Sequence, residues 1–364
     1  MGVGLFYAIE VLRAFWLTLP ITTIYYLRYF DLTAIGFFEA TLAFTVFVLE
    51  IPSGMLSDRI GHRMVASVGL VLFGAAMLVI GTMPATVPFL IAFIVWGAAE
   101  AFTSGAYQSA LYEHVRSHGE SYQDVKAKSG VLRGVTVVCA SLIGAFLFTI
   151  SPGLPFVIYG VVLILAGVLI RMLRAGVHVR EPFRLTTNGL GEVFWFAVML
   201  FAAFQAFVIL IQRPLLVEAG YSIIGLGIVM AVLFGIGWSS HRLIKGRSIT
   251  PMNMAGAGLL GALALVAISL ITTPLVVLPL VVFRIARDLH DIQVEIVVHE
   301  RVPNAMRATY FSILSAIGNA AQAIVLIAIG AMAGVFGLSF AALSLAVLIA
   351  ASSVLFAVRN RVAV

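Results

Sequence analysis

Long apolar segments alternate with short polar turns along all 364 residues of the chain. Each segment holds about 20 residues or more, the length that a helix needs to cross a bilayer. A transmembrane β-strand is about half as long, so these runs favour helices. Proline and glycine mark several of the turns, for example at Pro84, Pro152, Gly153 and Pro303. The pattern predicts twelve spanning helices, at residues 3–27, 32–56, 64–84, 87–114, 127–150, 153–173, 191–212, 222–240, 252–272, 274–300, 305–331 and 335–358.

The composition sets the class of protein. Hydrophobic residues make up 62% of the chain and charged residues only 10%, whereas soluble domains carry about 25% charged residues. We therefore expect an all-α integral membrane protein whose partner is the lipid bilayer. The formal net charge is +6, but there is no basic cluster with interleaved aromatic residues, so we expect no nucleic-acid partner. The sequence also lacks phosphate-binding, metal-binding, dinucleotide and nucleophilic-serine motifs, so we expect neither an enzyme nor a cofactor or metal.

Lysine and arginine orient the spans, because cytoplasmic loops carry an excess of both. With the N-terminus inside, the cytoplasmic loops and the C-terminus hold sixteen of these residues, and the external loops hold only Arg28 and Arg213. The remaining four, Arg13, Arg133, Arg284 and Arg287, fall within spans. We predict a multi-pass protein of the plasma membrane with both termini cytoplasmic.

The turn between the second and third spans has the unusual sequence Gly54-Met-Leu-Ser-Asp-Arg-Ile-Gly-His-Arg63. Its glycines let two helix ends approach closely, and its charges suit neighbouring helix termini. This segment resembles motif A of the major facilitator superfamily, G-x-L-[AS]-D-R-x-G-R-[KR]. The sequence departs from the motif at His62, where the family has a basic residue. It matches at Gly54, Leu56, Ser57, Asp58, Arg59, Gly61 and Arg63.

The resemblance extends to other parts of the chain and implies roles for residues in the turn. Residues 104–113 resemble the end of span four in efflux-type members, and residues 303–312 resemble the start of span eleven. It implies that Asp58 contacts the start of span eleven and that Arg59 pairs with the acid Glu113, which holds one conformation. The residues assigned to this conformational motif are Gly54, Asp58, Arg59, Gly61, Arg63 and Glu113.

The longest polar connection divides the chain into two predicted six-helix bundles, 1–174 and 191–364, joined by a cytoplasmic linker at 175–190. A weak repeat supports this division, because Gly237, Ser240 and Arg242 follow span eight in the register of Gly54, Ser57 and Arg59. His241 stands where Asp58 stands in the first half. The resemblance implies that a pseudo-twofold axis along the membrane normal relates the halves.

Ionisable side chains within spans are costly in lipid, so each is a candidate functional group. The resemblance implies that spans one, four, seven and ten line a central cavity, and many of the polar residues fall on those spans. The candidates for the substrate and proton pathway are Glu10, Arg13, Glu39, Glu100, Arg133, Gln205, Arg284, Asp288 and Asn319. Glu100 is interpreted either as a proton carrier or as the partner of Arg13 or Arg133 in a permanent ion pair.

Span ten is the richest in charge. At 100° per residue its arginines and carboxylates fall on one arc of about 120°, whereas His290 does not. Arg284 and Asp288 have i, i+4 spacing and can pair with each other. A cytoplasmic-side charge network is expected at Arg287, Asp291 and Glu295. A purely structural ion-pair network is the alternative interpretation of all five residues.

The resemblance implies a monomeric secondary transporter of a small molecule that works by alternating access. We expect a proton-coupled exporter of a drug, an amphiphile or a metabolite, with the proton gradient as energy source. Span five lacks the proline-containing glycine motif that drug antiporters often carry, which puts drug antiport in question. The alternatives are an importer or facilitator of a small anionic metabolite, which unpaired Arg13 and Arg284 would favour, and a sensor or scaffold without transport.

Overall fold

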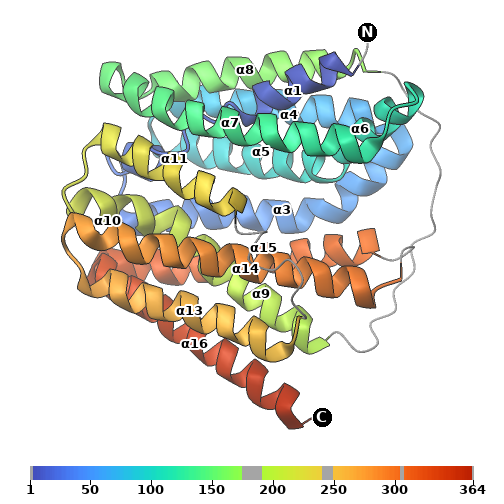
Figure 1. The fold of residues 1–364 in the computed structure, drawn as a ribbon. Helices are drawn as coiled ribbons and strands as arrows, with labels where there is room; N and C mark the ends of the chain where they lie inside the picture. The colour runs from blue at the N-terminus through green and yellow to red at the C-terminus, as the bar shows by residue number, and fades with distance from the viewer. Residues whose placement is uncertain (1–2, 174–190, 240–248, 304–306, 363–364) are drawn as a thin grey trace. The chain divides into compact units, whose positions relative to one another are not determined.

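The computed structural model describes residues 3–173, 191–239, 249–303 and 307–362. Within these ranges the regular elements are all helical (Figure 1). Eight of the described helices are long and apolar enough to cross a bilayer, and α8 (Leu154–Ile170) and α11 (Ile223–Ser239) are shorter apolar helices. The broken first span and the highly charged tenth span complete the twelve predicted spans. The prediction of an all-α membrane protein is confirmed.

The contacts of the chain form two compact units, which we describe separately. Unit 1 comprises residues 1–25, 41–180 and 223–231. Its helices, with α3 shared between the units, are α1 (Gly4–Ala14), α2 (Thr22–Tyr26), α3 (Leu32–Ile60), α4 (His62–Thr82), α5 (Thr86–Ser104), α6 (Ala106–Ser117), α7 (Tyr122–Ile150) and α8.

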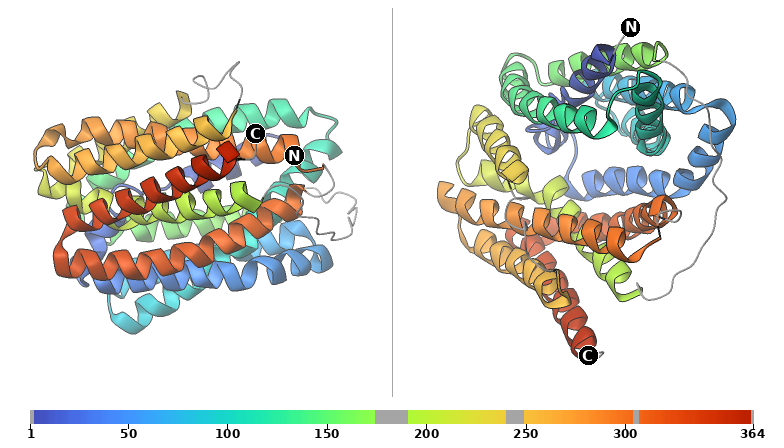
Figure 2. Two further views of the ribbon diagram at one scale, coloured as in Figure 1. Left: turned by 90° about the horizontal axis from the view of Figure 1, so that it is seen from below. Right: turned by 45° about the vertical axis from the view of Figure 1, so that its right-hand side comes forward.

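Unit 2 comprises residues 26–40, 181–222 and 232–364. Its elements are α9 (Gly191–Ala206), the π-helical turn η1 (Phe207–Ile211), α10 (Gln212–Glu218), α13 (Pro251–Leu270), η2 (Pro274–Val276), α14 (Val277–Arg301), α15 (Arg307–Phe336) and α16 (Leu338–Val362). In this unit α13 lies beside α14 and α16 (Figure 2).

The two units are not the same as the predicted halves. Residues 26–40 at the start of α3 cluster with the C-terminal helices, and residues 223–231 at the start of α11 cluster with the N-terminal helices. The division into repeats at 1–174 and 191–364 stays a prediction. The whole predicted linker and most of the second copy of the repeat, including His241 and Arg242, lie outside the described residues.

Small residues hold the helices of unit 1 together. Along the α4–α8 contact, a Cβ added at Gly74 would lie 2.5 Å from the carbonyl oxygen of Gly160, so the two backbones meet without side chains between them. Ser67 of α4 donates a 2.7 Å hydrogen bond to the carbonyl of Gly167. Packing through small residues and interhelical hydrogen bonds is typical of helices in lipid, where apolar burial does not drive association.

Two predicted spans are interrupted in the structure. The first, predicted as continuous over 3–27, leaves helical geometry between Ala14 and Thr22. Pro20 lies in this gap, and a proline cannot donate the backbone hydrogen bond that a helix interior requires. The fourth, predicted as 87–114, divides at Gly105 into α5 and the amphipathic helix α6.

Candidate substrate and coupling site

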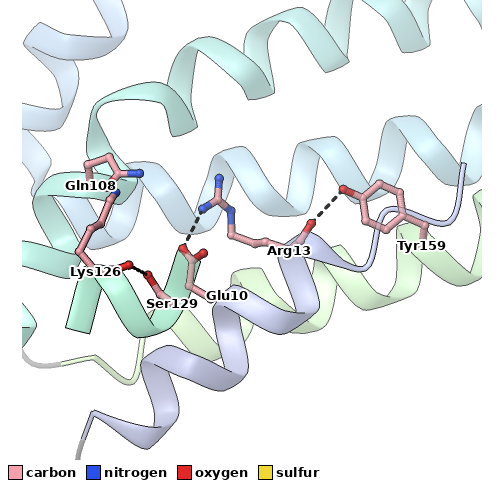
Figure 3. A network of polar contacts seen from close by, with 6 residues as sticks. All are labelled: Glu10, Arg13, Gln108, Lys126, Ser129 and Tyr159. Atoms are coloured by element: carbon pink, nitrogen blue, oxygen red, sulfur yellow. Dashed lines mark hydrogen bonds and ion pairs between the residues drawn. The ribbon is translucent and has the colours of Figure 1, made fainter. Parts of the chain in front are cut away.

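A polar cluster forms in unit 1 where α1 faces α6 and α8 (Figure 3). Glu10 and Arg13 lie one turn apart on α1, and Arg13 Nη1 is 3.5 Å from Glu10 Oε1. The guanidinium also stacks on Tyr107 of α6, with its carbon 3.5 Å from the ring centroid. Tyr159 of α8 donates a 3.3 Å hydrogen bond to the Arg13 carbonyl. Arg13 therefore has both an anionic and an aromatic neighbour, and its charge is not free.

The interrupted part of the first span lies next to this cluster. The carbonyl of Arg13 lies in the last turn of α1, where carbonyls lack a donor within the helix, and the hydroxyl of Tyr159 supplies its hydrogen bond. Gly144 of α7 contacts the carbonyl of Leu17 so closely that a Cβ at this position would overlap it. A backbone break is tolerated at membrane depth only where protein or a water-filled cavity surrounds it. The break thus depends on Gly144, which gives the α1 polar cluster a rigid neighbour.

Glu100, in the middle of span four, has a different environment from Glu10. Its Oε1 accepts a 3.1 Å hydrogen bond from Nε1 of Trp96 on the same helix. Arg13 acts on it electrostatically, but among the described residues no ion pair within 4.0 Å joins Glu100 to an arginine. The ion pair with Arg13 or Arg133, one of the two interpretations of Glu100, is therefore not formed among the described residues. Arg133 lies on α7 with an exposed side chain.

A second polar cluster lies on α14 in unit 2. Arg284 Nε is 2.8 Å from Asp288 Oδ2, so the predicted i, i+4 pair forms. The pair packs against the end of α11: a Cβ added at Gly237 would lie 2.7 Å from both Arg284 Nε and Asp288 Oδ2. The Arg284 guanidinium also lies 4.9 Å from the ring centroid of Phe234. Gly237 is the residue that the repeat aligns with Gly54, and here it makes room for an ion pair.

The other charges of span ten divide into two groups. Arg287 donates a 3.2 Å hydrogen bond to Gln205 of α9 and lies 3.8 Å from Asp291, which links spans seven and ten. Glu295 pairs with His299 at 3.9 Å, and both side chains are largely exposed. His290, off the predicted charged arc, is 1% exposed and lies against the rings of Phe196 and Phe204. These positions agree with the helical arc predicted for the charged residues.

Among the described residues, the side-chain hydrogen bonds of Asn319 lie within its own helix. Its amide nitrogen donates to the carbonyl and the hydroxyl of Ser315, at 2.8 and 3.4 Å. These bonds lie along α15 and reach no charged residue, so the structure brings Asn319 into neither polar cluster.

Span seven continues beyond its predicted end at residue 212 and contains a π-helical turn. The sequence places Arg213 in an external loop, but the structure places it on α10 with 6% exposure. The predicted span ends at residue 212, whereas the helix continues to Glu218. The turn η1 forms just before Pro214, with the amide of Gln212 bonded to the carbonyl of Phe207. π-helical turns are rare in proteins, and those that occur are often found at functional sites.

The predicted motif A turn joins α3 to α4, and Gly61 has a φ of 94° that suits glycine. His62 is the residue at which the sequence departs from motif A. Its Nδ1 lies 2.7 Å from Ser57 Oγ, and its Nε2 lies 3.6 Å from Glu113 Oε1. Glu113 thus has His62 as a neighbour, whereas the expected partner Arg59 is exposed on α3. Arg63 donates instead to the carbonyl of Leu173.

Two other expectations for this turn have different outcomes. A Cβ at Gly54 would meet nothing within 4 Å, so this glycine does not serve a close helix contact in the described structure. Asp58 is exposed, and its contact with the start of span eleven stays a prediction, because residues 304–306 lie outside the described ranges.

The comparison with known families decides the identity of the fold. The Major Facilitator Superfamily family model matches residues 3–290. The chain belongs to the major facilitator superfamily. This membership agrees with a membrane carrier and not with an enzyme.

Several proteins of the major facilitator superfamily type resemble the chain. An uncharacterized MFS-type transporter of Methanocaldococcus jannaschii is 31% identical over 128 residues, which is 33% of this chain and 30% of the relative. The solved structure of the nucleoside transporter NupG has a TM-score of 0.79 at 14% identity and covers 98% of this chain and 99% of that chain. A D-xylose-proton symporter has a TM-score of 0.73 at 15% identity, covering 96% and 95%. At these identities the two structures establish the fold alone.

Membership of the superfamily confirms the meaning of the motif A resemblance, but the contacts within the turn are those of this chain. The resemblance implies that Arg59 pairs with the acid at the end of span four, but in this structure the imidazole of His62 lies beside Glu113. The sequence showed the substitution at residue 62 but did not show its partner.

Proposed function

We propose that the chain is a secondary transporter that works by alternating access and couples proton movement to the export of a small amphiphilic or hydrophobic molecule. The observation that carries the proposal is that arginines are paired with acids in spans one and ten, which the resemblance places around the central cavity. Arg13 is paired with Glu10, Arg284 with Asp288, and Arg287 with Asp291, each within one helix. Among the described residues, the hydrogen bond to the Glu100 carboxyl comes from the Trp96 indole.

The pairing bears on the substrate. An anionic metabolite would be favoured by unpaired arginines, and here Arg13 and Arg284 each have an acid neighbour. Arg13 is also covered on one side by the Tyr107 ring. The arrangement supports an uncharged or weakly basic substrate with apolar surface. Charges that are already paired can still form hydrogen bonds to such a substrate, but they do not select strongly for a charged one.

The arrangement also bears on coupling. A proton carrier has to be a carboxyl that changes between a buried and a hydrated environment. Glu10 and Asp288 are held by arginines, whereas Glu100 accepts one neutral hydrogen bond and is free of an ion pair in the described structure. We assign the proton to Glu100, with Trp96 stabilising the carboxylate when the proton is lost.

Coupled flux in liposomes tests the proposal. Purified protein is reconstituted, a pH gradient is imposed, and uptake of a panel of amphiphilic dyes and small metabolites is followed. We expect gradient-driven accumulation of at least one amphiphile, which the variant Glu100→Gln loses while retaining substrate exchange without a gradient. Glu120→Gln, a change at an exposed turn residue, serves as the matched control. Binding without flux under any gradient would favour a sensor and would refute the proposal.

The orientation is tested separately. We propose that the protein lies in the plasma membrane with both termini and motif A on the cytoplasmic side, as the excess of lysine and arginine in those loops supports. Single cysteines at Arg59 and at the exposed turn residue Arg28, in a Cys139→Ser background, should react with an impermeant reagent from opposite sides. Reaction from the same side would contradict this topology.

A further inference from the structure

A buried carboxyl in the first part of α3 is not used by the proposed site. Glu39 is 6% exposed and belongs to unit 2 together with α10 and α15. Among the residues that the structure describes, its carboxyl makes no hydrogen bond and no ion pair within 4.0 Å. Burial of a carboxylate without such partners is costly, whereas the neutral acid is buried at much lower cost. The environment of Glu39 therefore distinguishes the two protonation states.

A backbone carbonyl holds the charged group that acts on Glu39. Arg213 of α10 is also 6% exposed and acts on Glu39 electrostatically. Its Nη1 donates a 2.8 Å hydrogen bond to the carbonyl of Val208, within the π-helical turn. The guanidinium is thus fixed at one edge of the turn. It stabilises a charge on Glu39, but in the described structure it forms no direct ion pair that would keep Glu39 permanently deprotonated.

Close packing of α3 on α15 keeps Glu39 buried. One turn before Glu39, a Cβ at Gly36 would lie 2.7 Å from the carbonyl of Leu326 and 3.0 Å from the Cα of Gly330. A Cβ added at Gly330 would in turn lie 2.8 Å from the carbonyl oxygen of Leu32. The two backbones meet without intervening side chains, so Glu39 becomes hydrated only when residues 26–40 move away from α15.

Few other titratable groups face this carboxyl. Besides Arg213 on α10, Tyr26 of α2 is part of the same electrostatic cluster. The charged residue of α15 is Arg307, at the first position of the helix and far along it from Gly330. Gln212, buried at 6%, is neutral. The protonation of Glu39 is thus governed by burial and by Arg213.

We propose that Glu39 is a proton-binding site whose proton exchange accompanies the separation of residues 26–40 from α10 and α15. In the packed arrangement the carboxyl holds its proton and is neutral. When the segment separates, the proton passes from the carboxyl oxygen to water, and the carboxylate that remains is hydrated. Acid on this side of the membrane then favours the packed arrangement and base favours the separated one. The inference rests on the alternating-access part of the proposed function, but not on the substrate or on Glu100.

Accessibility of a neighbouring residue tests the inference. Ala40, 3% exposed and next to Glu39, is changed to cysteine in a Cys139→Ser background. The rate of modification by a membrane-impermeant maleimide is measured in proteoliposomes from about pH 5 to about pH 9, after correction for thiolate reactivity measured on a free thiol. We expect the corrected rate to rise with pH, with a slope of up to about tenfold per pH unit, the limit for one proton.

Variants identify the group that titrates. Glu39→Gln, close in shape and always neutral, should remove the pH dependence and keep the low rate of the packed arrangement. Glu218→Gln, which removes an exposed carboxyl from α10, should leave the profile unchanged. If Glu39→Gln does not fold, Arg213→Gln provides the second test. It should move the profile to higher pH, because the carboxylate loses a stabilising charge.

The result that would overturn the inference is a pH profile of Ala40→Cys that Glu39→Gln leaves intact, or a parent profile that is flat. Proton-driven flux measured in the same proteoliposomes separates this from the proposed function. Loss of flux with a persisting Glu39-dependent profile would refute the coupled transporter and support the proton-binding site. Proton-driven flux together with a flat pH profile would support the coupled transporter and refute the proton-binding site at Glu39.

Discussion

His62 lies between two polar partners, with Nδ1 2.7 Å from the hydroxyl of Ser57 and Nε2 3.6 Å from the carboxylate of Glu113. Both side chains of the His62–Glu113 pair are mostly buried, at 12% and 15% exposure. The imidazole therefore joins the end of α3 to α6 at the motif A turn. We expect the strength of the His62–Glu113 interaction to depend on the protonation of the imidazole, since only the protonated ring forms an ion pair.

The first prediction replaces this imidazole by a permanent cation. His62→Arg should make the interaction with Glu113 independent of pH and stabilise unit 1 by up to about 1 kcal/mol, the range for partly exposed ion pairs. Thermal unfolding in detergent is measured from acid to mildly basic pH for His62→Arg, Glu113→Gln and the double variant. An equal gain in the Glu113→Gln background would show that Glu113 is not the partner.

The second prediction concerns the interrupted first span. Gly144→Ala places a Cβ on the carbonyl of Leu17, so it should destabilise the protein by about 1–3 kcal/mol, the usual cost of overpacking. Gly130→Ala on the same helix is the matched control, because a Cβ there meets nothing within 4 Å. It should be neutral or stabilising by about 0.5–1 kcal/mol, since alanine favours a helix. Thermal unfolding of both variants decides, and equal melting temperatures would contradict the contact.

The third prediction concerns the ion pair packed on α11. Gly237→Ala should displace Arg284 and Asp288 and destabilise the protein by about 1–3 kcal/mol. Gly235→Ala, two residues earlier on α11 with nothing within 4 Å of its Cβ position, is the control. In the double variant Arg284→Gln/Asp288→Asn the added methyl group should cost less, because the amides lack the charge attraction that fixes the pair. An equal cost of Gly237→Ala in both backgrounds would argue against this packing.

The fourth prediction concerns the two exposed charges of motif A. Because Asp58 and Arg59 lie on the surface of α3, Asp58→Asn and Arg59→Ala should leave the melting temperature nearly unchanged. They should shift the equilibrium between the two open states by about 1–3 kcal/mol. Distances between spin labels on the helix ends measure the populations. Unaltered distance distributions in both variants would show that the turn does not control the conformational change.

Much of the architecture was predictable because hydrophobic length and turn residues determine spanning helices almost directly. The pairing of Arg284 with Asp288 also follows from spacing along one helix, and the motif A turn was recognised by its resemblance to the family motif. What was missed depends on contacts between helices. Arg213 falls just after the predicted end of span seven at residue 212, but a π-helical turn leads into α10, where Arg213 is buried. No periodicity shows that Glu113 faces His62 or that Gly36 meets Gly330, because these residues are far apart in sequence.

The assignment of α3 to both units has a mechanical consequence. It is one unbroken helix from Leu32 to Ile60, yet its residues up to Ala40 cluster with one set of helices and those from Thr41 onward with the other. Thr45 donates to the carbonyl of Thr41 at 2.8 Å, a type of bond that bends helices. A helix anchored at both ends has to flex or change its partners whenever the two sets move. We therefore expect the helices that contact residues 26–40 to change with the conformational state.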